Sequence, residues 1–272
     1  FALHNLPCEL TLMMLAAASV SYAPAVRPAA RASSVVKMDI ADKAGLENLA
    51  VQLNPVVGYW DPLSILDQSE DNLQETIGWF RHAEIKHGRV AMAAFVGYCV
   101  QANGVYFPWK LTGGPNPVMH ADISAAGSPA DQWDALPFEA KCQIIGAIGT
   151  FELIGEYSEI LQMNGEKHYV RGGKPGYYPP FEGIFKAGLW PHPLPYSLYD
   201  PAGISKKRTP EAKERGLLVE INNGRLAMIG IFGFLAESKI PGSVPALSGL
   251  IKPYAGEYMA PFTSDAMASI YQ

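Results

Sequence analysis

A phrase whose residues could bind ligands is written twice in the chain. Residues 84–98 read EIKHGRVAMAAFVGY, and residues 220–234 read EINNGRLAMIGIFGF. Each copy contains an acid, a neutral side chain able to ligate a metal, and an arginine, in the order Glu84, His87, Arg89 and Glu220, Asn223, Arg225. Apolar sequence follows directly, and charges beside a membrane-length apolar segment are costly and usually functional. The repeat therefore predicts two matched helices that neutralise each other and hold a ligand between them.

The spacing inside the phrase predicts how these charges pair. Residues three apart share a helix face, so Glu84 and His87 point outward together, whereas Arg89 is rotated towards a neighbour. If the two copies cross about a pseudo-two-fold axis, Glu84 pairs with Arg225 and Glu220 pairs with Arg89. A carboxylate bonded to arginine stays ionised and keeps a lone pair, and the two charges are tolerated together where either alone would not be.

The donors in the phrase indicate metal centres that need only one protein ligand. A bare divalent ion requires several donors on one centre, but these side chains lie along helix faces, which suits many separate centres. The magnesium of chlorophyll already has four ring nitrogens and needs one axial donor. A histidine nitrogen, an asparagine or glutamine oxygen, or an arginine-paired carboxylate can supply it.

Small residues favour a direct crossing of the two helices. At matching offsets from the two glutamates, the copies carry Gly88, Ala91, Ala94 and Gly97, and Gly224, Ala227, Gly230 and Gly233. Ridges without bulk let helix backbones approach closely in lipid. The alternative is the ordinary abundance of glycine and alanine in membrane helices, which the matching register makes the weaker explanation.

The elements that must position these residues are three membrane-length helices, expected at about residues 73–101, 137–163 and 210–240. At about 29 residues, such a helix is ~43 Å long and must tilt in a ~30 Å hydrocarbon core. Basic residues crowd the second connection, whereas the first carries Lys110 alone, which puts the N-terminus and the second connection on the same, positive side. The predicted fold is an all-α membrane protein with three transmembrane helices. Its first and third helices cross as a pseudo-two-fold pair, and short amphipathic or interfacial segments accompany them.

The first 38 residues are predicted to be a targeting segment. Residues 11–38 contain no acid, whereas Arg27 and Arg31 stand among many alanines and serines. This composition is typical of an organelle transit peptide, with a disordered tail as the alternative. Residues 39–272 are expected to form the functional domain. The net charge of −5 gives no basis for binding nucleic acid.

The repeat extends upstream into two straps, in which an aromatic-Asp-Pro sequence precedes each copy at Asp61 and at Asp200. Together, the paired phrase, the three spans and the straps resemble the light-harvesting chlorophyll-binding superfamily over roughly residues 55–245. Within it, the chain is most similar to the chlorophyll a/c-binding antennae of red-lineage algae, of the fucoxanthin and peridinin types.

The resemblance implies a set of site residues. It makes Glu84, His87, Glu220 and Asn223 axial ligands of chlorophyll magnesium, and makes Arg89 and Arg225 their ion-pair partners. It also implies carotenoids in the grooves where the helices cross, with their ends near the Asp61 and Asp200 straps. Further ligands are expected at Gln143 and Glu152, for which the alternatives are a polar residue at a helix start and an acid facing the headgroups.

Two more positions are open on sequence alone. Glu237 stands fourteen residues after Asn223, ~21 Å further along nearly the same face. The superfamily commonly has glutamine there, and this glutamate has no obvious arginine partner. His120 lies in the first connection, where it is either an extra pigment ligand or an ordinary loop histidine.

The function implied by the resemblance is that of a non-enzymatic antenna in the plastid thylakoid membrane. It would bind chlorophyll a, chlorophyll c and carotenoids of the peridinin or fucoxanthin type and of the diadinoxanthin type. Its partners would be a photosystem core, neighbouring antenna proteins and thylakoid lipids. The alternatives are a photoprotective member that dissipates excitation, and a small transporter or channel that uses the paired charges as a relay.

Overall fold

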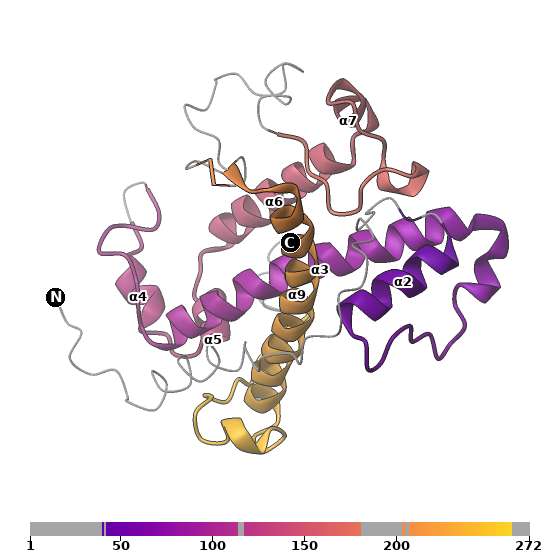
Figure 1. Ribbon diagram of the computed structural model, residues 1–272. Coiled ribbons are helices and arrows are strands. Elements are labelled where there is room, and N and C mark those ends of the chain that lie inside the picture. Colours follow the sequence, from indigo (N-terminus) through magenta and orange to yellow (C-terminus); the bar gives the residue numbers. More distant parts are fainter. Residues whose placement is uncertain (1–39, 41, 114–116, 181–202, 205–206, 263–272) are drawn as a thin grey trace. The chain divides into compact units, whose positions relative to one another are not determined.

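The computed structural model describes residues 40, 42–113, 117–180, 203–204 and 207–262 (Figure 1). The predicted targeting segment at residues 1–38 and the strap that contains Asp200 lie outside these residues. The α-helices are α2 (Lys43–Leu53), α3 (Leu73–Ala102), α4 (His120–Ser124), α5 (Pro129–Asp134), α6 (Phe138–Glu156), α7 (Ser158–Met163) and α9 (Pro210–Lys239). Short 3-10 helices are η1 (Asp67–Asn72), η2 (Tyr169–Arg171) and η4 (Pro245–Leu247). The described part of the chain contains no strand, so the helical fold class is confirmed there.

Local sequence explains where several helices begin. Asp42 caps α2, because its Oδ1 accepts a hydrogen bond of 3.3 Å from the backbone N–H of Gly45. Ser128 and Asp131 form a capping box at the start of α5, which also has a proline in its first turn. The hydroxyl of Thr209 accepts from Ala212 N at the start of α9, at 3.3 Å.

The two helices that carry the repeated phrase, α3 and α9, begin and end within one residue of the predicted positions. The middle helix, predicted at residues 137–163, is not continuous. It breaks at Tyr157, whose extended backbone (φ −74°, ψ 109°) separates α6 from α7. The sequence there contains no proline to signal a stop. The break follows Glu156, whose side chain is bonded to residues of the next connection, so tertiary contacts accompany the end of the helix.

Within the described part of the chain, α9 alone has the length and composition of a membrane span. Of the helices in the described ranges, it is the one long and apolar enough to cross a bilayer by length and composition. The repeated charges shorten the apolar stretch of α3, and α6 carries charges at both ends. The prediction of three spans is therefore not confirmed by composition and stays a prediction.

The chain divides into two compact units. The described parts of residues 96–136 and of residues from 232 onward form unit 1, and those of residues 36–95 and 137–231 form unit 2. Both α3 and α9 contribute to each unit. In unit 1, the tail after α9 is tied down by a bond of 2.8 Å from Tyr254 N to Ser238 O and one of 2.9 Å from Trp133 Nε1 to Pro261 O.

In unit 2, α3 and α9 cross where Gly88 meets Gly224 (Figure 1). A Cβ atom placed on Gly224 would lie only 2.8 Å from the Cα of Gly88. Beside the contact, Ile85 and Ile221 are buried in one hydrophobic cluster with Leu49 and Leu53 of α2.

The small-residue ridges do not remain in contact along their whole length. A Cβ atom on Gly97 would meet nothing within 4 Å, and one on Gly233 would meet only a side-chain atom of Leu247, at 3.9 Å. The direct crossing that the small residues predicted is therefore present, and its backbone contact is formed by Gly88 and Gly224. Helices that cross at an angle separate on either side of the crossing point.

Gly224→Ala is expected to destabilise the protein, because the new methyl group would press on the backbone of Gly88, and overpacking costs about 1–3 kcal/mol. Gly97→Ala is the matched control, since that position is open and alanine favours a helix by roughly 0.5–1 kcal/mol over glycine. Thermal unfolding in detergent micelles should give a lower melting temperature for Gly224→Ala than for wild type, and no decrease for Gly97→Ala. Equal melting temperatures for the two variants would contradict the glycine contact.

Candidate functional site

Two reciprocal ion pairs join the repeated phrases in unit 2. Arg89 Nε donates to Glu220 Oε1 at 2.6 Å, and Arg225 Nε donates to Glu84 Oε1 at 2.7 Å. The side chains of Glu84 and Glu220 remain 30% and 29% exposed. Each arginine thus neutralises a carboxylate through one oxygen, while the other oxygen makes no hydrogen bond to any residue that the structure describes.

The two pairs differ in how they are anchored. Arg89 Nη1 also donates to the backbone carbonyl of Gly176, at 2.5 Å. Gly176 lies in the connection after η2, so this connection holds the arginine of one pair in place. The repeat is symmetrical in sequence around the ion pairs, but the added anchor makes Arg89 the more constrained of the two arginines.

His87 and Asn223 are exposed donors at equivalent positions of α3 and α9. His87 Nδ1 lies 2.7 Å from the carbonyl oxygen of Ala83. Because a carbonyl only accepts, Nδ1 must carry the proton, which leaves the lone pair of a neutral ring on Nε2. This contact fixes one nitrogen of the exposed imidazole and leaves the lone pair on the other.

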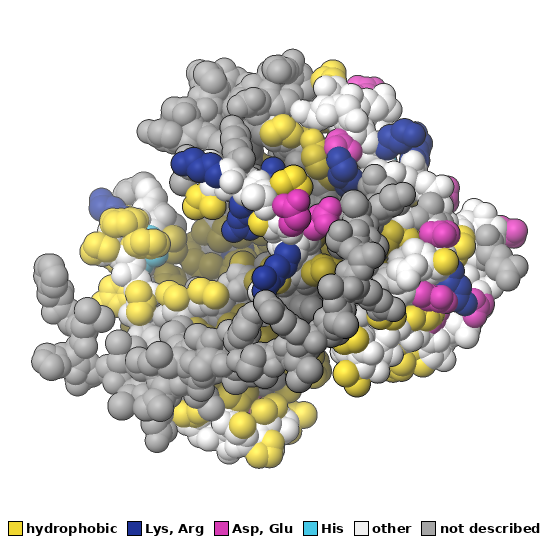
Figure 2. Space-filling model, in the orientation of Figure 1, with side chains coloured by type: hydrophobic (Ala, Val, Ile, Leu, Met, Phe, Trp, Pro, Cys, Tyr) yellow, Lys and Arg dark blue, Asp and Glu magenta, His cyan; other side chains and the backbone are white. Residues whose placement is uncertain are grey.

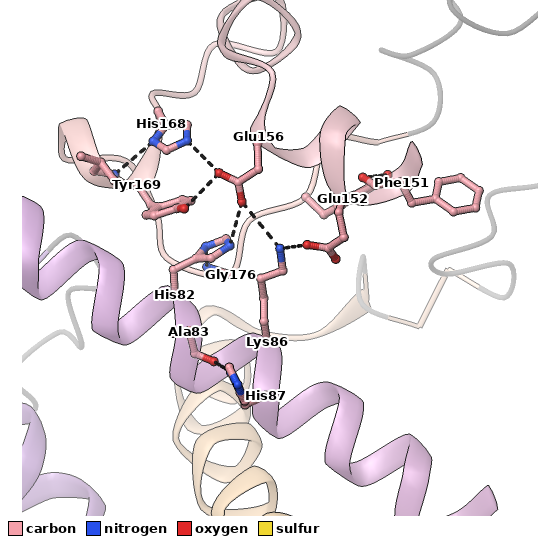
Figure 3. A network of polar contacts seen from close by, with 12 residues as sticks. His82, Ala83, Lys86, His87, Phe151, Glu152, Glu156, His168, Tyr169 and Gly176 are labelled. Carbon is pink, nitrogen blue, oxygen red and sulfur yellow. Dashed lines mark hydrogen bonds and ion pairs between the residues drawn. The ribbon is translucent and has the colours of Figure 1, made fainter. Parts of the chain in front are cut away.

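A second polar cluster joins α3, α6 and η2 around Glu156 (Figure 3). Glu156 Oε2 accepts from Tyr169 OH and from His168 Nε2, both at 3.0 Å. Lys86 forms an ion pair with Glu152 and lies 3.6 Å from Glu156 Oε1. Burial and the bond to Glu156 raise the pKa of Tyr169 to about 12, so its hydroxyl stays a donor. The cluster places two acids of α6 beside one cation of α3.

His82 completes this cluster from a buried position. Its Nδ1 accepts from Gly176 N at 3.1 Å, its ring stacks on Tyr169 with centroids 3.8 Å apart, and its Nε2 faces Glu156 Oε1 at 3.6 Å. Beside it lies a cavity of about 230 Å³, lined among others by Lys86 and Glu152. Gly176 thus contacts both His82 and Arg89, which links the cluster to the first ion pair.

The cluster was missed from the sequence, although its signal was present. His82 and Lys86 stand four residues apart on α3, and Glu152 and Glu156 stand four apart on α6. Such pairs lie on one helix face. Complementary charges at this spacing on two helices indicate that the two faces pack together.

The remaining predicted ligands of α6 lie apart from the crossing. Gln143 is exposed near the start of α6, and the structure brings it to no other predicted site residue. Glu152 is exposed near the end of the helix and has Lys86 as its cationic partner. Its carboxylate is therefore neutralised by a neighbouring helix, as Glu84 and Glu220 are.

Glu237 has a different environment from the one predicted. It is 2% exposed, and its two carboxylate oxygens accept from Gly242 N and Val244 N, both at 2.8 Å. The chain turns at Gly242 (φ 87°) just after α9, which aims these N–H groups back at the helix end. Both oxygens are bonded and no open face remains for a large ligand, so we leave Glu237 out of the ligand set. A carboxylate in the last turn of a helix interacts unfavourably with the helix dipole. Its presence in the sequence therefore indicated that hydrogen-bond donors from outside the helix would stabilise it.

The strap at Asp61 folds around its carboxylate. Asp61 accepts from the backbone N–H groups of Ile65 and Leu66 at 3.1 and 3.2 Å, and from Tyr59 OH at 3.1 Å. Burial opposes ionisation, but these donors outweigh it and lower the pKa of Asp61. Asp61 therefore organises the strap that leads towards α3.

No group of three or more His, Cys, Asp or Glu side chains in the described ranges could hold a metal ion. The site instead consists of single, outward-facing donors on two crossing helices whose charges pair with each other. These features define a helical protein that holds cofactors along its helix faces.

Residues 46–239 match the family model of the chlorophyll a-b binding proteins, and the chain belongs to this family. Similar proteins include the chloroplastic fucoxanthin-chlorophyll a-c binding protein of Trieres chinensis, which is 27% identical over 242 residues, covering 85% of this chain and 94% of that protein. Protein C of the same name from Phaeodactylum tricornutum is 28% identical over 226 residues, covering 83% and 92%. Protein E from Macrocystis pyrifera is 28% identical over 218 residues, covering 79% and 82%. The resemblance seen in the sequence is thereby confirmed.

Replacing Arg89 by leucine is expected to lower the yield and the melting temperature of the folded protein, because Glu220 loses its partner. Removing one partner of a buried ion pair costs roughly 3–5 kcal/mol, and less for a partly exposed one. In the double variant Arg89→Leu/Glu220→Gln no charge is stranded, so much of the stability should return. The measurement is thermal unfolding of wild type and both variants in detergent. A double variant no more stable than Arg89→Leu would contradict the pairing.

Glu237→Ala is expected to loosen the chain just after α9, because two backbone N–H groups lose their acceptor. Limited proteolysis of the full chain should then cut faster between residues 240 and 250 than in wild type. Glu257→Ala, in the exposed part of the tail, is the control and should leave cleavage there unchanged. Unchanged cleavage in Glu237→Ala would show that the carboxylate does not hold this segment.

Proposed function

We propose that this protein is a light-harvesting antenna of the chloroplast thylakoid membrane. It binds chlorophyll a, chlorophyll c and carotenoids of the fucoxanthin or peridinin type and of the diadinoxanthin type, and it passes excitation energy to a photosystem. Family membership and the names of its relatives support this function. The observation that carries it is the pair of arginine-neutralised, half-buried carboxylates, each with one oxygen that bonds to no other described residue. No bond is made or broken, so the protein is not an enzyme.

The geometry supports four axial ligands to chlorophyll magnesium. Glu84 and Glu220 would use the carboxylate oxygen that their arginines do not bond, His87 would use Nε2, and Asn223 would use its amide oxygen. Chlorophyll, when bound, supplies the absorption of light and the excited state. The chain fixes where each ring lies, because the crossing at Gly88 and Gly224 sets the distance between the two ligand rows.

Two ligands on α6 extend this set. Glu152 resembles Glu84 and Glu220 in having a cation, Lys86, at its carboxylate. Gln143 offers an exposed neutral amide. We assign both as further chlorophyll ligands.

The membrane arrangement follows from the same charges. We propose that α3, α6 and α9 all cross the bilayer, with α3 and α9 parallel and crossing. The composition of α9 supports its span directly. The charges of α3 and α6 are paired with one another, which lowers the cost of holding them near lipid. Carotenoids would lie in the grooves beside the crossing, with one end near the Asp61 strap. Neighbouring antenna proteins and thylakoid lipids would contact the outer helix faces.

The two alternatives gain no support. A photoprotective protein would use the same residues, and no contact among the described residues favours it. A transporter needs charged groups that can change partners along a path. The charges at the crossing are instead fixed in pairs beside two touching backbones.

Purified from its membrane, the protein should carry chlorophyll a and c and carotenoid, as absorption and chromatography of the extracted pigments would show. His87→Leu should lose one chlorophyll per chain. His87→Gln is the matched control and should keep that chlorophyll with a shifted absorption band, because the second copy has an amide at the equivalent position. A stably folded, colourless wild-type protein would overturn the proposed function. Full pigment content in His87→Leu would overturn the role of His87 alone.

A further inference from the structure

Unit 1 exposes a row of aromatic side chains just after α3. Tyr106, Phe107 and Trp109, here named the aromatic shelf, all lie open, with Phe107 58% and Trp109 57% exposed. The rings of Phe107 and Trp109 stack with centroids 4.5 Å apart and planes 16° apart. Hydrophobic side chains gather on the surface over α4, with histidine atoms beside them (Figure 2). Exposed apolar patches of this kind mark places where something binds.

The backbone brings a histidine to the aromatic shelf. An isolated antiparallel bridge pairs Lys110 with Met119, and Leu111 N donates to Val118 O at 2.8 Å. This pairing sets His120, the first residue of α4, beside Phe107 and Trp109. Its ring meets both edge-on, at centroid distances of 5.7 and 6.5 Å.

His120 is oriented in the same way as His87. Its Nδ1 lies 2.8 Å from the carbonyl oxygen of Trp109, so Nδ1 carries the proton and Nε2 of the neutral ring carries the lone pair. Nε2 makes no hydrogen bond within the part of the chain that the structure describes. A histidine held by one nitrogen with the other left open is the usual arrangement of a metal ligand.

We propose that His120 Nε2 is the axial ligand of a further chlorophyll, whose ring lies against the aromatic shelf. This inference rests on the proposed antenna function and adds a site outside the repeated phrases. A ring bound axially stands perpendicular to the imidazole plane. The rings of Phe107 and Trp109 are inclined to the imidazole plane by 81° and 83°. They therefore have a suitable inclination for stacking on the chlorophyll ring.

A bare metal ion does not suit this position. A bare ion would need several donors. The described residues contain no group of three or more His, Cys, Asp or Glu side chains that could hold a metal ion. The aromatic shelf also offers no charge to balance an ion. A magnesium ion that already has four ring nitrogens needs only the one donor that His120 presents, and its large apolar ring covers the exposed aromatics.

The test uses the full chain refolded with a thylakoid pigment extract that contains chlorophylls a and c and carotenoids. His120→Phe removes the donor and keeps the aromatic bulk, so it should lose one chlorophyll per chain by pigment chromatography, with a matching negative band in the difference absorption spectrum. His120→Gln retains a donor and should keep the chlorophyll count. A His120→Phe complex with the wild-type chlorophyll count would overturn the proposal.

Chemical rescue separates ligation from a structural role. His120→Gly should lack the same chlorophyll, and added imidazole should restore it, since free imidazole can replace the missing ligand. Failure of imidazole to restore it would overturn the proposal, even if His120→Phe yields no complex. If His120→Phe keeps every chlorophyll but no longer associates with another membrane protein, the aromatic shelf is a protein-docking surface instead. Wild type without chlorophyll would refute the antenna function itself, whereas pigmented wild type with unaffected variants would refute only this site.

Discussion

The structure depends on one constraint, which is that the glutamate and the arginine of each repeated phrase must each find an opposite charge on the other helix. Arg89 and Arg225 reach across the crossing to Glu220 and Glu84, and neither pair can form unless the backbones come close. Gly88 and Gly224 allow that approach because neither has a side chain at the contact. The ion pairs and the glycine contact therefore depend on each other. The arginines neutralise the acids, the glycines set the helix distance, and the carboxylate oxygens left over face outward.

The same solution is used once more, with different residues. Glu152 of α6 has Lys86 of α3 as its cation, and Glu156 beside it is surrounded by donors from η2 and α3. Gly176 connects this cluster with the crossing, since its carbonyl accepts from Arg89 and its N–H donates to His82. One short loop segment thereby orients residues of both sites. An acid with a cation from a neighbouring helix is thus the common feature of Glu84, Glu152 and Glu220, the three glutamates that we propose as ligands.

Sequence reasoning succeeded where the information is local or repeated. The ranges predicted from the sequence, 73–101 and 210–240, agree with α3 and α9 to within one residue at each end. The duplicated phrase predicted that Glu84 lies opposite Arg225, the pairing that the structure has. It failed where the partner comes from elsewhere in the chain. The break at Tyr157 has no local stop signal, and the donors to Glu237 are backbone N–H groups aimed by a turn at Gly242. The orientation of His120 depends on a carbonyl eleven residues away, which the amino-acid types alone do not reveal.

The outward faces of the long helices have a consequence for the protein before its pigments are bound. Only 11% of the apolar window of α9 is buried within the chain, and the one buried hydrophobic cluster noted in unit 2 is small. Whatever binds the folded form of such a chain adds to its stability by mass action. Newly made chains without pigment would then remain open to proteases, whereas loaded chains would persist. The amount of antenna protein would therefore follow the rate of chlorophyll synthesis without a dedicated sensor, because chains that lack pigment are degraded.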